Sequence, residues 1–310
     1  MNGSVSDHAI VVQNVTKRYG NFTAVDDLSF EVRRGEIFSM LGPNGAGKTT
    51  TIRMILDILK PDSGAIAVLG GPISDQTKDR IGYLPEERGL YRNVPVIEVL
   101  TYLAQLKGLS HKDAVRRATD MLNAVDLGAN IKSKVSELSK GMQQKVQIIA
   151  TILHQPELVI IDEPFSGLDP VNTQVIKDML YQMNSEGVTI VMSTHQMQDI
   201  EEMSSRLLMI DHGRRVLYGG VQEVRQRFAQ NAVIVEGEGD WSALAGVTRV
   251  EAMDNTHTVM LHLAEGVTPD AVMEAMAVGA DYHVRRFELA VPSLNEIFIQ
   301  VAGNNRNHTA

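Results

Sequence analysis

Residues 37–49 read Ile-Phe-Ser-Met-Leu-Gly-Pro-Asn-Gly-Ala-Gly-Lys-Thr. The start reads as a short buried strand, and Gly42–Thr49 fits the phosphate-loop pattern G-x-x-x-x-G-K-[ST]. In such a loop, glycines let backbone N–H groups turn toward phosphate oxygens, Lys48 supplies a positive charge, and Thr49 offers a hydroxyl to magnesium. Apolar residues follow at helical spacing: Ile52, Ile55, Leu56 and Leu59. The stretch predicts strand, phosphate loop and helix; the alternative is a glycine-rich turn that binds nothing.

The composition excludes several classes of protein. The 310 residues are 44% hydrophobic, which is ordinary for a chain with a core, and the lack of cysteine excludes disulfides and thiol chemistry. No run of about 18 apolar residues occurs, and the polar start Met1–His8 lacks the pattern of a secretory signal. We therefore expect no transmembrane helix and no secretion.

The charge is unevenly distributed. Residues 231–310 hold 11 acidic and 4 basic side chains, and so carry −7 of the net charge of −9. An acidic region is a poor electrostatic partner for nucleic acid or anionic lipid. We therefore expect no nucleic-acid partner.

Strand-like and helix-like segments alternate over residues 9–220, which predicts an α/β domain with a parallel core sheet. Residues 95–127 carry helical periodicity with many charges. A phosphate ligand is expected at the carboxyl ends of the strands. The predicted strands are Ile10–Val12, Leu28–Val32, Ile37–Leu41, Ala65–Leu69, Ile81–Leu84, Leu158–Ile161, Val188–Met192 and Arg206–Ile210.

The pattern changes near Asn231, where a separate small α+β domain is predicted to begin. Its end, residues 303–310, is polar and expected to be disordered. The predicted elements are strands Val233–Glu236, Thr248–Ala252, Thr258–His262 and Val284–Leu289, and helices 268–277 and 293–301.

Two acidic residues end the apolar run Leu158–Ile161. Asp162 is placed to hold magnesium through water, and Glu163 to polarise a water that attacks a γ-phosphate. The alternative is an acidic turn after a buried strand, which the phosphate loop upstream disfavours.

Further motifs stand in the order seen in ATP-binding-cassette (ABC) ATPases, and the resemblance covers roughly residues 8–220. Leu138–Gln143, which reads Leu-Ser-Lys-Gly-Met-Gln, resembles the signature Leu-Ser-Gly-Gly-Gln. Ser166–Asp169 resembles the D-loop, His195 the switch histidine, and Tyr19 the aromatic residue that stacks on adenine.

Each of these motifs has a plainer interpretation when it is taken singly. His195 alone is more often a surface or capping histidine, Tyr19 a turn residue, and Ser139 a helix cap. Their shared order and spacing favour the family interpretation.

The resemblance implies a phosphate-loop (P-loop) NTPase cassette with a parallel core sheet, an antiparallel β subdomain and a helical subdomain, plus the C-terminal α+β domain. The expected bounds are residues 8–225 for the nucleotide-binding cassette, about 88–155 for its helical subdomain, 231–302 for the accessory domain and 303–310 for the disordered tail.

The resemblance also implies the ligands, ATP and Mg²⁺, and the residues that handle them. Glu163 and His195 are the expected catalytic residues, Ser139 and Gly141 the contacts supplied in trans, and Asp169 the D-loop carboxylate. The expected ATP-binding residues are Tyr19, Gly42, Pro43, Asn44, Gly45, Ala46, Gly47, Lys48, Thr49 and Thr50, and the expected magnesium ligands are Thr49, Asp162 and Glu86.

Two departures from the family pattern stand out. Lys140 and Met142 occupy signature positions where Gly and Gln are usual, although the serine and second glycine remain. Glu86 stands where the family has Gln, so its role in cation binding stays open. Its surroundings, Leu84–Tyr91, and the C-terminal Val291–Phe298 are similar to the bacterial exporter branch that includes sodium and multidrug efflux ATPases.

The resemblance implies an ATP-hydrolysing subunit that pairs head to tail with a second copy and powers separate membrane permease subunits. The chain would then lie in the cytoplasm, peripheral at the inner face of the cell membrane. The alternatives are an ABC-type ATPase that acts on a ribosome or DNA, and a non-enzymatic ATP-dependent regulator. The C-terminal domain is open to three roles: regulation, dimer clamp or partner dock.

Overall fold

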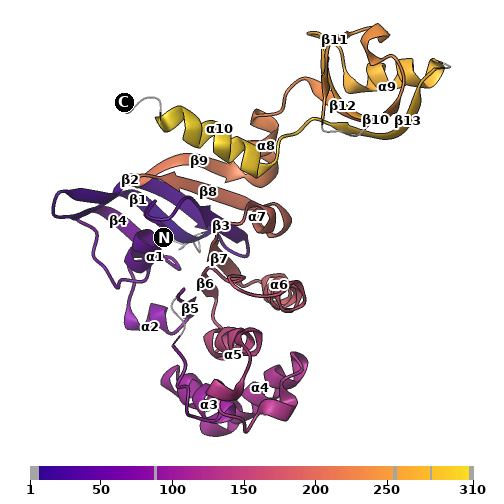
Figure 1. Cartoon of the computed structure of the whole chain (residues 1–310). Helices are drawn as coiled ribbons and strands as arrows, with labels where there is room; N and C mark the ends of the chain where they lie inside the picture. Colours follow the sequence, from indigo (N-terminus) through magenta and orange to yellow (C-terminus); the bar gives the residue numbers. More distant parts are fainter. Residues whose placement is uncertain (1–6, 87–88, 254–256, 280, 307–310) are drawn as a thin grey trace. The chain divides into compact units, whose positions relative to one another are not determined.

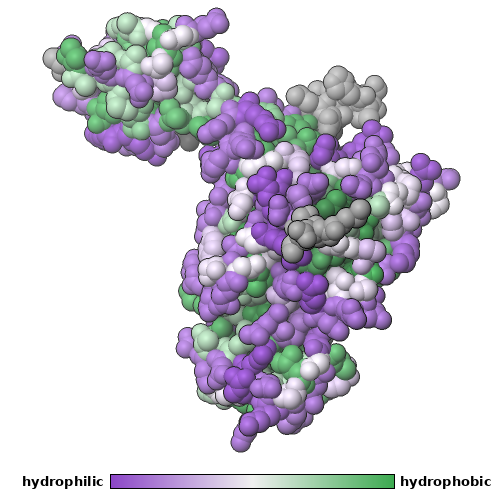
Figure 2. Space-filling model, turned by 180° about the vertical axis from the view of Figure 1, so that it is seen from behind, coloured by the Kyte–Doolittle hydropathy of each residue, from purple (hydrophilic) through white to green (hydrophobic). Residues whose placement is uncertain are grey.

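The computed structural model describes residues 7–86, 89–253, 257–279 and 281–306. The chain divides into two compact units, Met1–Val221 and Gln222–Ala310. Within the described ranges, no helix is long and apolar enough to cross a membrane. Hydrophilic residues cover most of the face shown in Figure 2, with smaller apolar patches between them.

A six-stranded sheet lies at the centre of the first unit, with strand order β5-β6-β7-β3-β8-β9 (Figure 1). Five strands are parallel, as predicted: β3 (Ile37–Leu41), β5 (Ile81–Leu84), β6 (Leu158–Asp162), β7 (Thr189–Ser193) and β8 (Arg206–Asp211). All residues of β3, β6 and β7 are buried, which is typical of parallel strands covered on both faces. The order places the ends of these three strands side by side although they are distant in sequence.

Two features of the first unit differ from the sequence prediction. β9 (Arg214–Gly220) is an antiparallel edge strand that we did not predict. β1 (His8–Tyr19) and β2 (Phe22–Arg33) are much longer than the apolar runs at their centres, because strand pairing continues through polar residues. With β4 (Ser63–Val68) they form an antiparallel sheet in the order β2-β1-β4.

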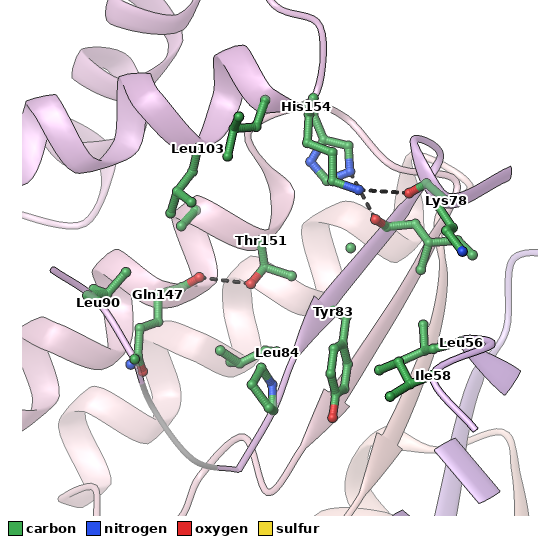
Figure 3. Close-up of a pocket in the computed structure, with 17 residues that line it drawn as sticks. Leu56, Ile58, Lys78, Tyr83, Leu84, Leu90, Leu103, Gln147, Thr151 and His154 are labelled. Atoms are coloured by element: carbon green, nitrogen blue, oxygen red, sulfur yellow. Dashed lines mark hydrogen bonds between the residues drawn. The ribbon is translucent and has the colours of Figure 1, made fainter. Parts of the chain in front are cut away.

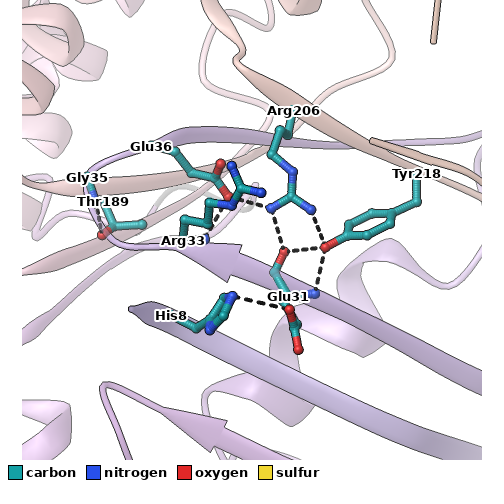
Figure 4. Close-up of polar contacts among 8 residues, drawn as sticks. All are labelled: His8, Glu31, Arg33, Gly35, Glu36, Thr189, Arg206 and Tyr218. Carbon is teal, nitrogen blue, oxygen red and sulfur yellow. Dashed lines mark hydrogen bonds and ion pairs between the residues drawn. The ribbon is translucent and has the colours of Figure 1, made fainter. Parts of the chain in front are cut away.

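Arg206 and its hydrogen-bond partners connect the two sheets of the first unit (Figure 4). Arg206 on β8 donates to the Glu31 carbonyl of β2 at 3.3 Å, to Glu36 Oε1 at 3.3 Å, and to the Tyr218 hydroxyl of β9. Tyr218 in turn donates to the Glu31 carbonyl at 2.9 Å. A planar guanidinium suits this arrangement because its several N–H groups reach different acceptors at once.

Helices α3 (Val96–Leu106), α4 (His111–Ala124) and α5 (Lys140–Ile152) gather at one end of the first unit (Figure 1). The segment predicted as helical over 95–127 is therefore two helices, separated by a turn in which Gly108 has a φ of +86°. Their apolar faces meet in one cluster whose centre includes Val99, Leu100, Leu122, Val146 and Ile149.

Shorter helices and the helices that follow the central strands complete the first unit. They are α1 (Lys48–Ile55), α2 (Asp75–Lys78), α6 (Pro170–Ser185) and α7 (Met197–Met203), with single 3-10 turns at Gly128–Asn130 and Val135–Glu137.

The second unit contains a four-stranded antiparallel sheet in the order β11-β12-β10-β13. Its apolar core includes Val233, Val235 and Leu261, and Trp241 stacks on Tyr282 with ring centroids 5.5 Å apart. The elements are α8 (Val221–Arg227), β10 (Ala232–Glu238), a 3-10 turn (Trp241–Ala243), β11 (Val247–Ala252), β12 (Thr258–Leu263), α9 (Pro269–Val278), β13 (His283–Leu289) and α10 (Leu294–Arg306).

The predicted disorder of residues 303–310 stays a prediction, although the last helix extends into this segment. Helix α10 continues to Arg306 through residues of low helix propensity. Extending an existing helix adds one hydrogen bond for each residue fixed, so a helix started upstream propagates into a weak segment. Residues 307–310 lie outside the described residues.

Candidate active site

The phosphate loop connects β3 to α1, and its glycines are required by close backbone contacts. Gly42 has a φ of +153°, and a Cβ there would lie 2.1 Å from the Ile210 carbonyl oxygen. Gly47 has a φ of +108°, and a Cβ would lie 2.5 Å from the Ala24 carbonyl oxygen. Gly47 caps α1 without any side-chain hydrogen bond. The first N–H groups of the helix are therefore left for an anionic ligand.

Lys48, near the end of the phosphate loop, is buried. Its Nζ donates to the Gly42 carbonyl at 2.6 Å and to the Pro43 carbonyl at 3.2 Å. Burial lowers the pKa of Lys48, and the carboxylates of Glu163, Asp162 and Glu86 counteract this shift. A cation is thus held next to the loop by hydrogen bonds to two backbone carbonyls, which suits it to meet a phosphate.

Asp162 ends β6 and faces the start of α1. Thr49 Oγ1 donates to Asp162 Oδ2 at 3.2 Å, and the Ser193 hydroxyl donates to Asp162 Oδ1. Ser193 ends β7 opposite Asp162 in the parallel pairing. Sequence reasoning missed Ser193, because a polar residue at the end of an apolar strand carries no signal that names its partner.

Glu163 and His195 come together from the ends of neighbouring strands. His195 Nδ1 lies 2.8 Å from Glu163 Oε1. Glu163 has a φ of +54°, a left-handed conformation that is strained for a non-glycine residue, and its N–H donates to the Ser193 carbonyl at 3.0 Å. Strain of this kind is common at functional sites. The pair therefore presents a fixed carboxylate beside an exposed imidazole, which is an acid–base arrangement.

A cleft of about 490 Å³, which we call the phosphate-loop cleft, collects most of the predicted site residues. It is lined by Tyr19, Phe22, Ala24, Asn44, Gly45, Ala46, Gly47, Lys48, Thr49, Thr50, Glu86, Asp162, Glu163, Ser166 and His195. Two predicted ATP-binding residues, Gly42 and Pro43, are not in this lining, and their carbonyls instead accept from Lys48.

Phe22 is a lining residue that sequence reasoning missed. It pairs with Tyr19 across the turn between β1 and β2, and both rings are exposed. The turn Gly20-Asn21 between two aromatic residues was the available signal, since glycine and asparagine favour a tight hairpin. Two aromatic rings therefore border the cleft where one was expected.

The predicted signature residues are not part of the cleft lining. Ser139 caps α5 by accepting from the Met142 N–H at 3.3 Å, which confirms the predicted cap. A Cβ on Gly141 would lie 2.7 Å from Asn172 Nδ2, and that nitrogen donates to Asp169 Oδ2 at 2.5 Å. Ser139, Gly141 and Asp169 thus form a second group, at the adjoining starts of α5 and α6, outside the cleft lining.

The cleft's oxygen donors fit a magnesium ion that is shared with a substrate. Within the described ranges, no three His, Asp or Glu side chains form a complete metal site. Thr49, Asp162 and Glu86 offer one hydroxyl and two carboxylates to the same cleft. Magnesium is usually bound by one or two carboxylates together with phosphates of the substrate, so this incomplete set matches its chemistry.

A second hollow of the first unit, which we call the apolar groove, has a volume of about 430 Å³. Its lining includes Leu56, Ile58, Tyr83, Leu84, Leu90, Leu103, Leu106, Gln147 and His154 (Figure 3). Gln147 Oε1 and His154 Nδ1 are buried there without a hydrogen-bond partner among the described residues. The pKa of His154 is lowered to about 4, chiefly by burial and also by Lys107, while the Ile81 carbonyl and Asp79 act in the opposite direction. The groove is thus an apolar surface with two unused polar atoms.

The cleft and the groove share one short segment of chain. Tyr83, Leu84 and Pro85 line the apolar groove, while the next residue, Glu86, lines the phosphate-loop cleft. The two hollows therefore adjoin along the chain at the bond between Pro85 and Glu86.

Two family models match the chain. The model described as ABC transporter matches residues 25–166, and the model described as ATP-binding protein DrrA1-3-like, C-terminal domain, matches residues 219–302. The first match lies within the first unit and the second covers most of the second unit, while residues 167–218 lie between the two matches.

Curated relatives and a solved structure agree with these matches. An uncharacterized ABC transporter ATP-binding protein, YhaQ of Bacillus subtilis (strain 168), is 39% identical over 95% of this chain and 98% of its own length. The linearmycin resistance ATP-binding protein LnrL of the same organism is 32% identical over 94% of this chain and 97% of its own. A solved ATP-binding subunit of an ABC transporter superposes with a TM-score of 0.66 and 32% identity, covering 71% of this chain and 93% of that one.

Proposed function

The chain belongs to the ATP-binding proteins of ABC transporters, and from this premise we propose that two copies stack head to tail and drive export through separate membrane subunits. As a member of this family it binds ATP and is an ATPase. The predicted fold class, an ABC cassette followed by a small accessory domain, is confirmed.

ATP in the phosphate-loop cleft would be held by the loop backbone and by Lys48. The ammonium group of Lys48 would give up its hydrogen bonds to the loop carbonyls and donate to the terminal phosphates instead. Tyr19 and Phe22 are placed at the edge of the cleft to stack on the adenine base. Thr49, Asp162 and Glu86 would hold a magnesium ion, which would supply positive charge to the phosphates of ATP. Glu163 would accept a proton from the attacking water, and His195 holds that carboxylate in place.

The observation that carries the dimer proposal is the separation of the two predicted groups within one chain. The cleft is lined by Lys48, Glu163 and His195, but not by Ser139 or Gly141. The start of α5 presents helix N–H groups to an anion, as the start of α1 does. A second chain that places its α5 over the cleft would complete the site and enclose the ATP.

The apolar groove is the proposed contact for the membrane subunit. It is lined largely by aliphatic side chains, and it leaves Gln147 Oε1 as an acceptor for a donor from a partner. The shared segment Tyr83–Glu86 would carry the state of the cleft to that partner. Export is supported by LnrL, which is named for linearmycin resistance and aligns with both units, and by the DrrA-like match of the second unit. The chain would then act at the inner face of the cell membrane.

A mixing experiment tests the head-to-tail site. Lys48→Ala disables the phosphate loop of one chain, and Ser139→Arg blocks the start of α5 in another. Each variant alone is therefore expected to be nearly inactive in ATP hydrolysis. In a 1:1 mixture, half of the dimers are mixed, and each has one intact composite site. We expect turnover to recover to roughly a quarter of the wild-type rate. A mixture as inactive as its components would contradict the shared site.

Co-purification tests the exporter proposal. The full chain, expressed in its own cell with an affinity tag, is expected to bring down a polytopic membrane protein in detergent. Leu106→Asp in the groove is expected to lose that partner, and Val278→Asp in the second unit, where the side chain is 83% exposed, serves as the matched control. Recovery of ribosomes or DNA in place of a membrane protein would support the alternative function.

A further inference from the structure

A buried cation lies behind the acid–base pair of the cleft. Lys177 on α6 is 7% exposed, although lysine is rarely buried unless it is paired. Its Nζ lies 2.9 Å from Asp199 Oδ1 and 2.5 Å from Glu202 Oε2, both on α7. Lys177 therefore joins two helices that follow different strands of the central sheet.

The same ammonium group also contacts the loop that carries Glu163. Lys177 Nζ lies 5.6 Å from the centroid of the Phe165 ring, and Phe165 is buried two residues after Glu163. Asp199 lies four residues after His195, in the first turn of α7. One side chain thus contacts both segments from which the 2.8 Å contact between Glu163 and His195 is made.

The charges of this cluster depend on one another. Burial lowers the pKa of Lys177, but hydrogen bonds to Glu202 and Asp199 outweigh it and raise the pKa, so the lysine is charged. Asp199 Oδ2 is buried without a hydrogen-bond partner among the described residues. Lys177 is therefore the main compensation for the Asp199 carboxylate, and losing Lys177 alone leaves that buried charge uncompensated, whereas losing Asp199 leaves Lys177 paired with Glu202.

We propose that Lys177 and Asp199 are positioning residues for ATP hydrolysis, which hold the Glu163 loop and the His195 segment in register through Phe165 and α7. Neither residue lines the cleft, so neither touches the nucleotide. Their effect is on the geometry of the acid–base pair. This inference rests on the catalytic roles proposed for Glu163 and His195.

A double substitution separates positioning from mere stability. Lys177→Met alone leaves the Asp199 charge buried, which is expected to destabilise the fold. Lys177→Met combined with Asp199→Leu leaves no buried charge, and apolar replacement of a whole buried pair is often neutral in stability. In the double variant we expect the melting temperature to return close to the wild-type value. We expect kcat to stay at least about 10-fold low, with the KM for ATP within about twofold, because misplaced reacting groups slow only the chemical step.

The ion pair at the opposite end of β6 provides the matched control. Arg80 and Glu157 form two hydrogen bonds there, at 2.5 and 2.6 Å, remote from Glu163 at the other end of the strand. Arg80→Met combined with Glu157→Leu is expected to keep kcat within about twofold of wild type. Glu202→Gln provides a graded variant that keeps the fold, because its side chain is 44% exposed. We expect it to lower kcat about twofold to fivefold with KM unchanged.

Full-length chains are assayed for melting temperature, ATP affinity, kcat and KM, with Glu163→Gln in parallel. The proposal is overturned if the double variant recovers both its melting temperature and its wild-type kcat, or if it is unfolded and Glu202→Gln keeps the wild-type kcat. Undiminished turnover in Glu163→Gln would instead refute the proposed role of Glu163, so the two failures are distinguishable.

Discussion

The phosphate-loop cleft and the apolar groove are hollows of similar volume in one unit, about 490 and 430 Å³, built on opposite principles. The cleft is formed by backbone N–H groups, glycines and charged side chains, whereas aliphatic side chains dominate the groove. A backbone site binds a ligand common to a whole family, while a side-chain surface is free to vary with its partner. The comparison suggests that chemistry is confined to the cleft and partner choice to the groove, which the following substitutions test.

Glu163→Gln in the cleft is expected to have the largest effect. Loss of a general base typically lowers the rate about 100- to 10,000-fold, so hydrolysis should nearly stop while ATP binding remains. Turnover assays and gel filtration with ATP measure this, and a trapped dimer is expected. Glu157→Gln, immediately before β6, is the control. Undiminished turnover in Glu163→Gln would contradict the assignment of the chemical step to the cleft.

Lys48→Ala in the cleft is expected to weaken ATP binding as well as hydrolysis. Removing one preorganised phosphate contact costs on the order of 100-fold or more in rate. Isothermal titration with ATP and a turnover assay report the two effects separately. Lys60→Ala, where the side chain is 79% exposed, is the matched control. Equal affinity in the Lys48 variant would show that the loop backbone alone holds the phosphates.

Leu106→Asp in the groove is expected to act on partner coupling and not on nucleotide affinity. The side chain is 63% exposed, so the fold should tolerate the change, but a charge disfavours an apolar contact. The measurement is ATP hydrolysis with the membrane partner in detergent or lipid, where we expect stimulation by the partner to fall several-fold. If stimulation is retained, the groove is not the contact surface.

His154→Gln in the groove is expected to change only the pH dependence of stability. The pKa of the folded state, about 4, lies below the ordinary value of 6.5, so the unfolded chain binds the proton more readily. The neutral form contributes stability that is present above pH 6.5 and lost as the pH falls toward 4. Glutamine keeps a donor for the Ile81 carbonyl and does not titrate. Melting curves should show an acid-induced loss smaller by roughly 2–4 °C in the variant; identical curves would contradict the assignment.

The sequence predicted most of the elements but few of their limits. The apolar runs of β3, β6 and β7 were found because burial on both faces leaves a continuous apolar pattern. β9 was missed because Arg214–Gly220 is polar at its start and partly exposed, as an edge strand is. The break at Gly108 divided one predicted helical segment into two.

The sequence predicted the charged residues of the cleft better than the residues that contact them from other strands. Lys48, Asp162, Glu163 and His195 stand in recognisable local motifs, and all four line the cleft. Phe22 and Ser193 were missed because each matters through a partner on another strand. Residues such as these are specified by strand pairing, which a local pattern does not contain.

What the sequence alone determined is the expected chemistry of the loop: glycines, a lysine and a threonine at the spacing of Gly42–Thr49 predict a phosphate site. Only the tertiary structure decided which distant groups meet. The strand order β6-β7-β3 places His195 Nδ1 2.8 Å from Glu163, and the packing of α6 against α7 brings Lys177 to Asp199. The physical reason is the distance along the chain over which each interaction acts. The geometry of a loop depends on residues that are neighbours in sequence. A contact between strand ends depends on the order of the strands, which is set by packing of the whole sheet.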